Sequence, residues 1–265
     1  MLIDVHAHFY QPESNRADWA ERNASRLRAG QQIGITRHVA SILGTWGRRS
    51  PTYFPSSADV STGNDALLHL MRSHPGLIDG YACVNPNFTV HALAEIDRCL
   101  AAGMIGIKLA ASRRANDLLL DPIADAASRH GVPVLHHIWQ HRRHEWPGQE
   151  ASDATELVQL ARRHRTVPFI LAHIGGGGDW LHTLPAVRPA GNVFIDLSGS
   201  GVDRGMLEAC LAAVGPARLL WGCDITMCTG WAKLRYLEQL LTLDELDLIR
   251  WRNAASIFPA GSFPA

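Results

Sequence analysis

The feature that most constrains the fold of this chain is an alternation between short apolar runs and segments with helical periodicity. Eight such runs, rich in valine, isoleucine and leucine, recur along the sequence between glycine, proline or asparagine residues. They are Leu2–His6, Ile35–Leu43, Leu77–Val84, Met104–Leu109, Val132–His137, Phe169–His173, Val193–Leu197 and Arg218–Gly222. Short, nearly continuous apolar runs are typical of parallel strands that are buried on both faces.

Segments that repeat apolar residues with a helical period lie between these runs. The clearest are Val90–Ala102, Asp153–His164, Met206–Val214 and Leu234–Leu241. Thr242 followed by Glu245 has the pattern of a capping box, which predicts that a last helix opens there and runs to about Ala255.

Eight strands that alternate with helices over this length indicate an α/β fold, the (β/α)8 TIM barrel. Because barrels of this size fold as one unit, we expect a single domain over residues 1–265. A doubly wound open sheet is the alternative, although no GxGxxG motif follows the first run. Tyr10–Gly30 and Trp46–Gly63 are the longest stretches without clear regular structure, and in a barrel both would lie over the catalytic mouth.

The charge balance limits the classes of partner. Lysine and arginine number 25 and aspartate and glutamate number 25, so the net charge is zero, which argues against binding nucleic acid or an anionic membrane surface. No apolar run is long enough to predict a membrane span.

The five cysteines are odd in number and lack a CxxC motif, and no leader-like segment precedes His6. We therefore expect a cytoplasmic protein with a small-molecule substrate, and a homodimer is compatible with the exposed helices of a barrel.

The first apolar run ends at His6, and a second histidine, His8, follows after one alanine. Residues i and i+2 of a strand point to the same side. In a barrel that side is the interior, at the end where active sites lie. Two imidazoles in these positions can bind one metal ion together.

Other apolar runs also end in side chains that bind metals. The fifth run ends in His136 and His137, the sixth ends in His173, and Asp224 follows the eighth. Because adjacent strand residues face opposite ways, only one of His136 and His137 can look inward. A barrel brings the carboxyl ends of its strands around one axis, so we expect these groups to converge. Burying them is costly unless they are paired or bound to a metal.

With these motifs the sequence resembles the amidohydrolase-related branch of the amidohydrolase superfamily, which includes aminocarboxymuconate semialdehyde decarboxylase and lactone hydrolases. The segments that carry the resemblance are Asp4–His8, Gly106–Leu109, Pro133–His137, Leu171–Gly176, Gly222–Asp224 and Asn253–Ala255. The resemblance implies one divalent metal ion, Zn²⁺ in the first place, with Mn²⁺, Fe²⁺ or Co²⁺ as alternatives. It implies metal ligands or direct water partners at His6, His8, His137 and Asp224, favours His137 over His136, and makes His173 the catalytic histidine.

We therefore expect a metal-dependent hydrolase that acts on a lactone, ester or amide carbonyl. The ion would lower the pKa of a water ligand to about 7, Asp224 would accept its proton, and His173 would polarise the carbonyl. Non-oxidative decarboxylation of a small unsaturated or aromatic acid uses the same residues and stays open, although the compact chain favours hydrolysis. A barrel that binds a metal or a ligand without turnover is disfavoured, since the full set of residue types is present.

Arginines indicate the chemistry of the substrate. Twenty-three of the 25 basic residues are arginine, whose forked guanidinium suits carboxylates. The predicted substrate-binding residues, on or after the fourth and fifth strands, are Arg113, Arg114, Arg142, Arg143, Trp139 and Lys108. A solvated charge run is the alternative for each arginine pair, and a bridge between two metal ions is the alternative for Lys108. The sequence thus predicts a small anionic substrate.

Overall fold

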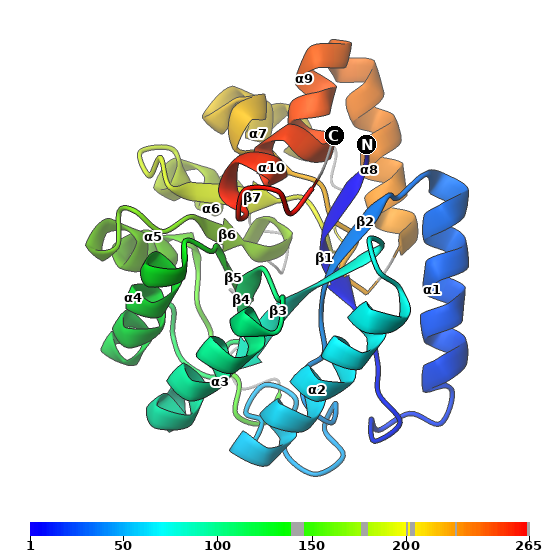
Figure 1. The fold of residues 1–265 in the computed structure, drawn as a ribbon. Helices are drawn as coiled ribbons and strands as arrows, with labels where there is room; N and C mark the ends of the chain where they lie inside the picture. The colour runs from blue at the N-terminus through cyan, green and yellow to red at the C-terminus, as the bar shows by residue number, and fades with distance from the viewer. Residues whose placement is uncertain (139–145, 176–179, 200, 202–204, 226, 264–265) are drawn as a thin grey trace.

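The computed structural model describes residues 1–138, 146–175, 180–199, 201, 205–225 and 227–263. One sheet of eight parallel strands, paired in chain order, forms the centre of the molecule (Figure 1). The strands are β1 (Ile3–His8), β2 (Arg37–Ser41), β3 (Ile78–Val84), β4 (Gly106–Leu109), β5 (Val134–His136), β6 (Phe169–Leu171), β7 (Val193–Asp196) and β8 (Leu219–Leu220). Seven of the predicted runs contain one of these strands, and the first overlaps β1, which continues past it to His8, so the strand prediction is confirmed.

The sheet closes through contacts between β1 and the residues that follow β8. The backbone N–H of Val5 donates to the carbonyl of Trp221 (3.1 Å), and that of Asp224 donates to the carbonyl of His6 (2.7 Å). Ala7 and Asp224 also form a parallel bridge. The fold is therefore the (β/α)8 barrel that the alternation predicts, and not an open doubly wound sheet.

Helices follow the strands and surround the sheet (Figure 1). They are α1 (Trp19–Ile33), α2 (Ser57–Ser73), α3 (Thr89–Ala101), α4 (Asp121–His130), α5 (Ala154–Arg163), α6 (Trp180–Val187), α7 (Met206–Val214), α8 (Met227–Leu240), α9 (Leu243–Asp247) and α10 (Asn253–Ile257). The capping box at Thr242 and Glu245 is confirmed, and a π-helical turn, Leu248–Arg252, joins α9 to α10. Among the described residues, no helix combines the length and hydropathy needed to cross a bilayer.

The two stretches without clear periodicity are only partly irregular. Helix α1 occupies much of Tyr10–Gly30, and α2 begins inside Trp46–Gly63, so those parts are helical although the sequence shows no clear period there. Helix α1 buries only Asn23 and Gly30 fully, so no apolar stripe marks it in the sequence. Helix α2 begins after Ser56, whose side chain accepts a backbone hydrogen bond and caps it.

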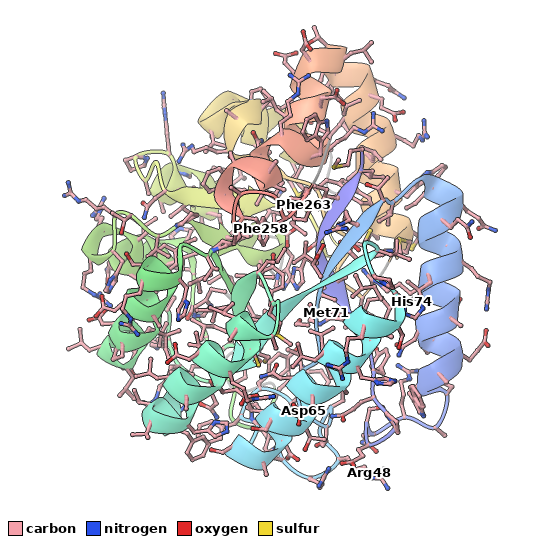
Figure 2. The ribbon with its side chains drawn as sticks, in the orientation of Figure 1. Arg48, Asp65, Met71, His74, Phe258 and Phe263 are labelled. Atoms are coloured by element: carbon pink, nitrogen blue, oxygen red, sulfur yellow. The ribbon has the colours of Figure 1, made fainter. Side chains whose placement is uncertain are left out.

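The C-terminal segment packs against the apolar residues of the barrel. Phe258 and Phe263 lie side by side, with ring centroids 5.4 Å apart (Figure 2). They belong to one apolar cluster with Ile3 and Leu220, and Phe258 also contacts the ring of Tyr81. Ile3 is the first residue of β1, so this cluster fills the amino end of the barrel. The polar strand-end residues are found at the opposite end.

Candidate metal centre and active site

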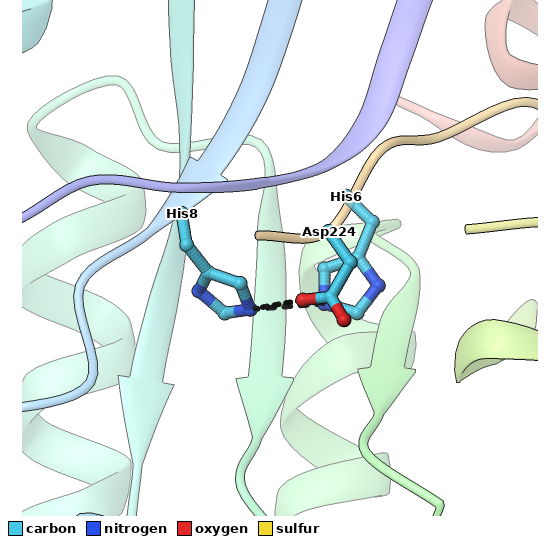
Figure 3. Close-up of side chains that lie close together, drawn as sticks. All are labelled: His6, His8 and Asp224. Atoms are coloured by element: carbon cyan, nitrogen blue, oxygen red, sulfur yellow. Dashed lines mark hydrogen bonds and ion pairs between the residues drawn. The ribbon is translucent and has the colours of Figure 1, made fainter. Parts of the chain in front are cut away.

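Three of the predicted residues converge at the carboxyl end of the barrel. His6 and His8 come from β1, and Asp224 comes from the segment after β8 (Figure 3). The Nε2 atoms of His6 and His8 are 3.2 Å apart. The Oδ1 atom of Asp224 lies 3.2 Å from Nε2 of His8 and 3.8 Å from Nε2 of His6. We call these three residues the donor triad.

The backbone around the donor triad is held by a buried ion pair. Asp4 accepts hydrogen bonds from the backbone N–H groups of His6 (3.2 Å) and Cys223 (2.9 Å). The Nη2 atom of Arg26 donates to Asp4 (2.7 Å), while its Nη1 atom donates to the carbonyl of Asp224 (2.5 Å). Asp224 itself has a left-handed backbone conformation with φ of 56°. Asp4 and Arg26 therefore fasten β1 to the segment that carries Asp224.

The spacing of the donor triad fits one small divalent cation. Ligands bound at about 2.0–2.2 Å with tetrahedral angles lie about 3.3–3.6 Å from one another, and the three separations here are 3.2, 3.2 and 3.8 Å. Among the described residues, the donor triad is the one group of three or more histidine, cysteine, aspartate or glutamate side chains whose ligand atoms all lie within 4.8 Å of each other. Two imidazoles and one carboxylate are also a donor set typical of catalytic metal sites. The residues present fit a divalent metal ion.

A carboxylate fixes the orientation of the first imidazole. The Nδ1 atom of His6 lies 2.7 Å from Oδ2 of Asp196 and 3.1 Å from Oγ of Ser198. Because Nδ1 donates its proton to Asp196, Nε2 carries the lone pair and faces the triad. Burial alone would raise the pKa of Asp196, but His6 and Ser198 hold that pKa below its usual range. Asp196 therefore stays ionised and orients His6.

A buried lysine lies against the donor triad. The Nζ atom of Lys108 is 2.9 Å from Nε2 of His6, and the side chain is fully buried. Burial lowers the pKa of Lys108 to about 8, against the opposing attraction of Asp224. No ion pair joins Lys108 to a carboxylate within the described parts of the chain. Since one lone pair serves one partner, Lys108 and a metal ion compete for Nε2 of His6.

The two other predicted histidines form a pair beside the triad. Nε2 of His173 lies 3.1 Å from Nδ1 of His137, and the rings of His173 and His6 are stacked with centroids 5.6 Å apart. Burial lowers the pKa of His173 to about 3 and that of His137 well below 6.5, so both imidazoles are neutral at pH 7. His137 contacts His173 and is not one of the three donors that lie within 4.8 Å of each other, so its role as a ligand stays a prediction. His136 is buried and donates from Nδ1 to the carbonyl of His137 (2.8 Å).

Aromatic side chains from the loops after β1 and β2 line this region. The ring of Trp46 packs edge-on against His8, with centroids 5.4 Å apart, and Tyr10 packs against Trp46 at 4.7 Å. Tyr53 lies 5.1 Å from His137. These loops belong to the stretches that were expected over the mouth of the barrel, and their aromatic rings contact the site histidines.

The predicted substrate-binding arginines that the structure describes contact surface groups. Arg113 donates to the Asn87 side chain (2.5 Å) and lies 3.4 Å from Asp117. Arg114 pairs with Glu156 at 3.0 Å. Both arginine side chains are 40% exposed, and none of their contacts in the described parts of the chain reaches the donor triad. The remaining predicted contacts, Trp139, Arg142 and Arg143, lie outside the described residues.

Sequence reasoning missed two residues that shape the site. Asp196 ends β7 as a single acid in an apolar run, which is the same signal that marked the strand-end histidines. Lys233 in α8 is buried and donates to the carbonyls of residues 197, 198 and 199 at 2.8, 2.9 and 3.0 Å. It is one of only two lysines in a chain rich in arginine, and burial lowers its pKa to about 8.

Comparison with known proteins agrees with this architecture. The family model described as amidohydrolase matches residues 3–260. Among solved structures, 5-carboxyvanillate decarboxylase from Sphingomonas paucimobilis is 16% identical, with 98% of this chain and 99% of that chain covered and a TM-score of 0.73. Dihydroxybenzoic acid decarboxylase from Polaromonas sp. JS666, solved with bound manganese, is 16% identical (97% and 96% covered, TM-score 0.72). A protein described as 2-pyrone-4,6-dicarboxylic acid hydrolase from Pseudomonas putida is 17% identical (97% and 96% covered, TM-score 0.64).

The family match extends over nearly the whole chain, while the structural matches at this level of identity show a shared fold. None of the curated proteins compared with the chain matches it. The solved structures include both decarboxylases and a hydrolase, so they do not fix the kind of reaction. The barrel, the donor triad at its carboxyl end and the match over residues 3–260 lead to one conclusion: the chain belongs to the amidohydrolase family.

Proposed function

We propose that this protein is a metal-dependent hydrolase that adds water to the lactone, ester or amide carbonyl of a small, carboxylate-bearing substrate. The observation that carries the proposal is the buried ammonium of Lys108, 2.9 Å from Nε2 of His6 and next to the donor triad. Addition of water to a carbonyl places negative charge on its oxygen, and a fixed cation in a buried site stabilises that charge. Lys108 is suited to this role because no described carboxylate forms an ion pair with it.

His6, His8 and Asp224 would hold the metal ion, and His137 is the candidate for a further ligand. When bound, a divalent ion supplies Lewis-acid polarisation and brings the pKa of water toward neutrality. Nitrogen and oxygen donors accept Zn²⁺, which we propose first, and also Mn²⁺, Fe²⁺ or Co²⁺. The manganese bound in the Polaromonas enzyme, which shares this fold, supports keeping Mn²⁺ among the alternatives.

The side chains around the triad have distinct parts in the proposed reaction. Asp224 accepts the proton of the attacking water, since its carboxylate is ionised: burial alone would raise its pKa, but His8 and His6 hold that pKa well below the usual range. His173 donates a hydrogen bond that polarises the substrate carbonyl. Asp196 keeps the imidazole of His6 in one orientation throughout.

Non-oxidative decarboxylation is the second candidate. It is favoured by the two decarboxylases described above, whose TM-scores of 0.73 and 0.72 exceed the 0.64 of the protein described as a hydrolase. In that reaction the same side chains would bind the substrate carboxylate and return a proton to carbon after CO₂ leaves. The two reactions differ in product, because hydrolysis releases an acid and decarboxylation releases CO₂.

The test combines metal analysis with a product assay. Protein purified without chelator is expected to hold about one equivalent of a transition metal per chain, and the His6→Ala/His8→Ala double variant is expected to hold none. The metal-loaded protein is then assayed for acid release from a panel of lactones and aryl esters, and for CO₂ release from unsaturated and aromatic acids. Acid release that depends on both histidines supports the proposal, whereas CO₂ release alone assigns the second candidate. Two equivalents of metal would assign Lys108 as a bridge, and no uptake of metal would overturn both candidates.

A further inference from the structure

A cavity of about 170 Å³ opens beside the donor triad, between α1 and the beginning of α8. The lining residues are His8, Tyr10, Arg16, Arg22, Ser25, Arg26, Ala29, Ile225 and Met227. His8 belongs to both the cavity lining and the triad, so the cavity adjoins the reaction centre. None of its three arginines is among the predicted substrate-binding residues.

The lining of this cavity is positively charged. Its described lining residues include three guanidinium groups and no carboxylate. Asp18 lies outside the lining and pairs with Arg16 (2.5 Å) and Arg22 (3.0 Å) from a half-exposed position. Within the described parts of the chain, the two terminal nitrogens of Arg22 make no hydrogen bond to protein. These N–H groups are donors that a ligand could use.

The third guanidinium is buried and supplies a permanent positive charge. The Arg26 side chain is only 8% exposed, and it donates to Asp4 and to the carbonyl of Asp224. Its Nε atom is buried and has no hydrogen-bond partner among the described residues. Because Asp4 offsets much of the charge of Arg26, the group that Arg26 offers to the cavity is this N–H donor.

The cavity is joined to the site by a row of stacked side chains. The guanidinium of Arg16 lies 4.9 Å from the centre of the Tyr10 ring and donates to its hydroxyl (3.3 Å). Tyr10 packs against Trp46, and Trp46 packs against His8. Arg16 therefore has a defined position, because it stacks on Tyr10, which packs through Trp46 against His8 of the donor triad.

The volume decides what the cavity can hold. Pockets for whole small-molecule ligands are about 300–1,000 Å³, so a cavity of about 170 Å³ is too small for a complete substrate. One carboxylate with a short carbon chain fits that space.

We propose that this cavity is the subsite for a distal carboxylate of the substrate, held by Arg16 and Arg22 beside the buried Nε–H donor of Arg26. The inference rests on the proposed function, in which the reacting carbonyl lies at the donor triad. It specifies the substrate as a small acid whose carboxylate is separated from the reacting carbonyl by a short chain. In this proposal the substrate carboxylate is bound from the loop after β1 and from α1. It is not bound by Arg113 and Arg114, which pair with surface groups.

The test measures binding, so that it does not depend on turnover. The purified protein is titrated calorimetrically with succinate, glutarate and adipate, and with the monoacids that lack one carboxylate: propionate, butyrate and valerate. At least one diacid is expected to bind about tenfold more tightly than its monoacid, since charge-assisted hydrogen bonds to a second carboxylate add affinity. The Arg16→Gln/Arg22→Gln variant is expected to bring this ratio close to one.

Two further variants keep the inference open to refutation. Asp18→Asn removes the carboxylate that competes for both guanidinium groups, so the diacid preference is expected to rise about threefold. Arg28→Gln is the matched control on α1, since Arg28 pairs with Glu21 away from the cavity, and it is expected to leave the ratio unchanged. A preference that survives Arg16→Gln/Arg22→Gln, or the lack of any diacid preference in the wild type, overturns the subsite.

The outcome is separable from that of the proposed function. Arginine-dependent diacid binding without acid release from any lactone or ester would support the subsite and reject the hydrolase. Acid release from charged and neutral lactones at equal kcat/KM, with no diacid preference in the titration, would support the hydrolase and reject the subsite.

Discussion

The Nδ1 atom of His6 lies 2.7 Å from Oδ2 of Asp196, and both side chains are fully buried. The same carboxylate oxygen accepts a hydrogen bond from the backbone N–H of His173 (3.2 Å). Asp196 on β7 thus links the histidine of β1 to the backbone that follows β6. One acid at the end of a strand therefore sets the orientation of a proposed metal ligand and the position of the proposed catalytic residue.

Replacement of Asp196 by asparagine is expected to weaken metal binding. The new amide could present its N–H to Nδ1 of His6 and favour the wrong imidazole tautomer, so the lone pair on Nε2 would be lost in part. Loss of such an outer carboxylate typically costs about 10–100-fold in metal affinity. The measurement is a competition titration of Zn²⁺ with a chromophoric chelator.

The matched control for this variant is Asp97→Asn. Asp97 forms an aspartate–histidine pair of the same length with His130 (2.7 Å), but on the surface and away from the site. It is expected to leave Zn²⁺ affinity unchanged. Equal affinities for Asp196→Asn and wild type would mean that Asp196 does not orient a metal ligand.

The sequence predicted the barrel and the donor triad because both depend on periodicity and on strand ends. Apolar runs mark buried strands, and parallel strands carry their terminal residues to one place, so His6, His8 and Asp224 could be expected to meet. Asp196 carries the same signal, but a lone acid after a strand is more often a helix cap or a turn residue. Helix α1 was not predicted because it lacks an apolar stripe. The arginines that line the cavity beside α1 were therefore not predicted as a group either.

The surface arginines show what the sequence could not supply. Arg113 and Arg114 follow β4 at the expected end of the barrel, yet their partners are side chains such as Asn87 and Glu156. Which acid a loop arginine meets depends on loop conformation and on residues distant in sequence, and neither is encoded in a local pattern.

Replacement of Lys108 by methionine is expected to raise metal affinity and lower turnover. The change removes a positive charge that repels a cation and frees the lone pair on Nε2 of His6, so Zn²⁺ affinity should rise at least about tenfold. Turnover should fall by at least about tenfold, since the stabilising cation is lost. The measurements are the chelator competition described above and initial rates with saturating Zn²⁺.

The other buried lysine provides the control for this change. Lys233→Met also removes a buried ammonium, but one that serves three backbone carbonyls. It is expected to destabilise the protein by about 2–4 kcal/mol, because those carbonyls lose charge-assisted hydrogen bonds, without a gain in metal affinity. A Lys108→Met variant with wild-type or weaker affinity for Zn²⁺ would contradict the competition for His6.

The metal-free protein is expected to lose stability between about pH 6.5 and pH 4. Burial lowers the pKa of His8 and His136 to about 4 and that of His173 to about 3. The unfolded chain takes up these protons near pH 6.5 and the folded chain does not, so the free energy of unfolding falls as the pH decreases. Each histidine contributes a slope of up to about 1.4 kcal/mol per pH unit, measured by urea unfolding at a series of pH values.

The His136→Asn variant isolates one of these contributions. Asparagine keeps an N–H donor for the carbonyl of His137 but does not titrate, so the slope is expected to decrease by the equivalent of one proton. His69→Asn, at an exposed position, controls for the change of residue type. An unchanged slope in His136→Asn would show that this histidine does not take part in the acid instability.

Replacement of Gly199 by alanine is expected to lower turnover without loss of metal. Gly199 has a φ of 84°, and an added Cβ would lie 2.5 Å from Cβ of His173, so the imidazole that we propose as catalytic must move. Gly205→Ala is a close control, since Gly205 has a φ of 83° and open space around its Cα. Both variants carry a backbone strain of about 1 kcal/mol, while only Gly199→Ala is expected to reduce kcat, by at least about tenfold. Metal content is expected to match the wild type in both, because His173 lies outside the donor triad. Equal kcat values in the two variants would place the reacting carbonyl out of reach of His173.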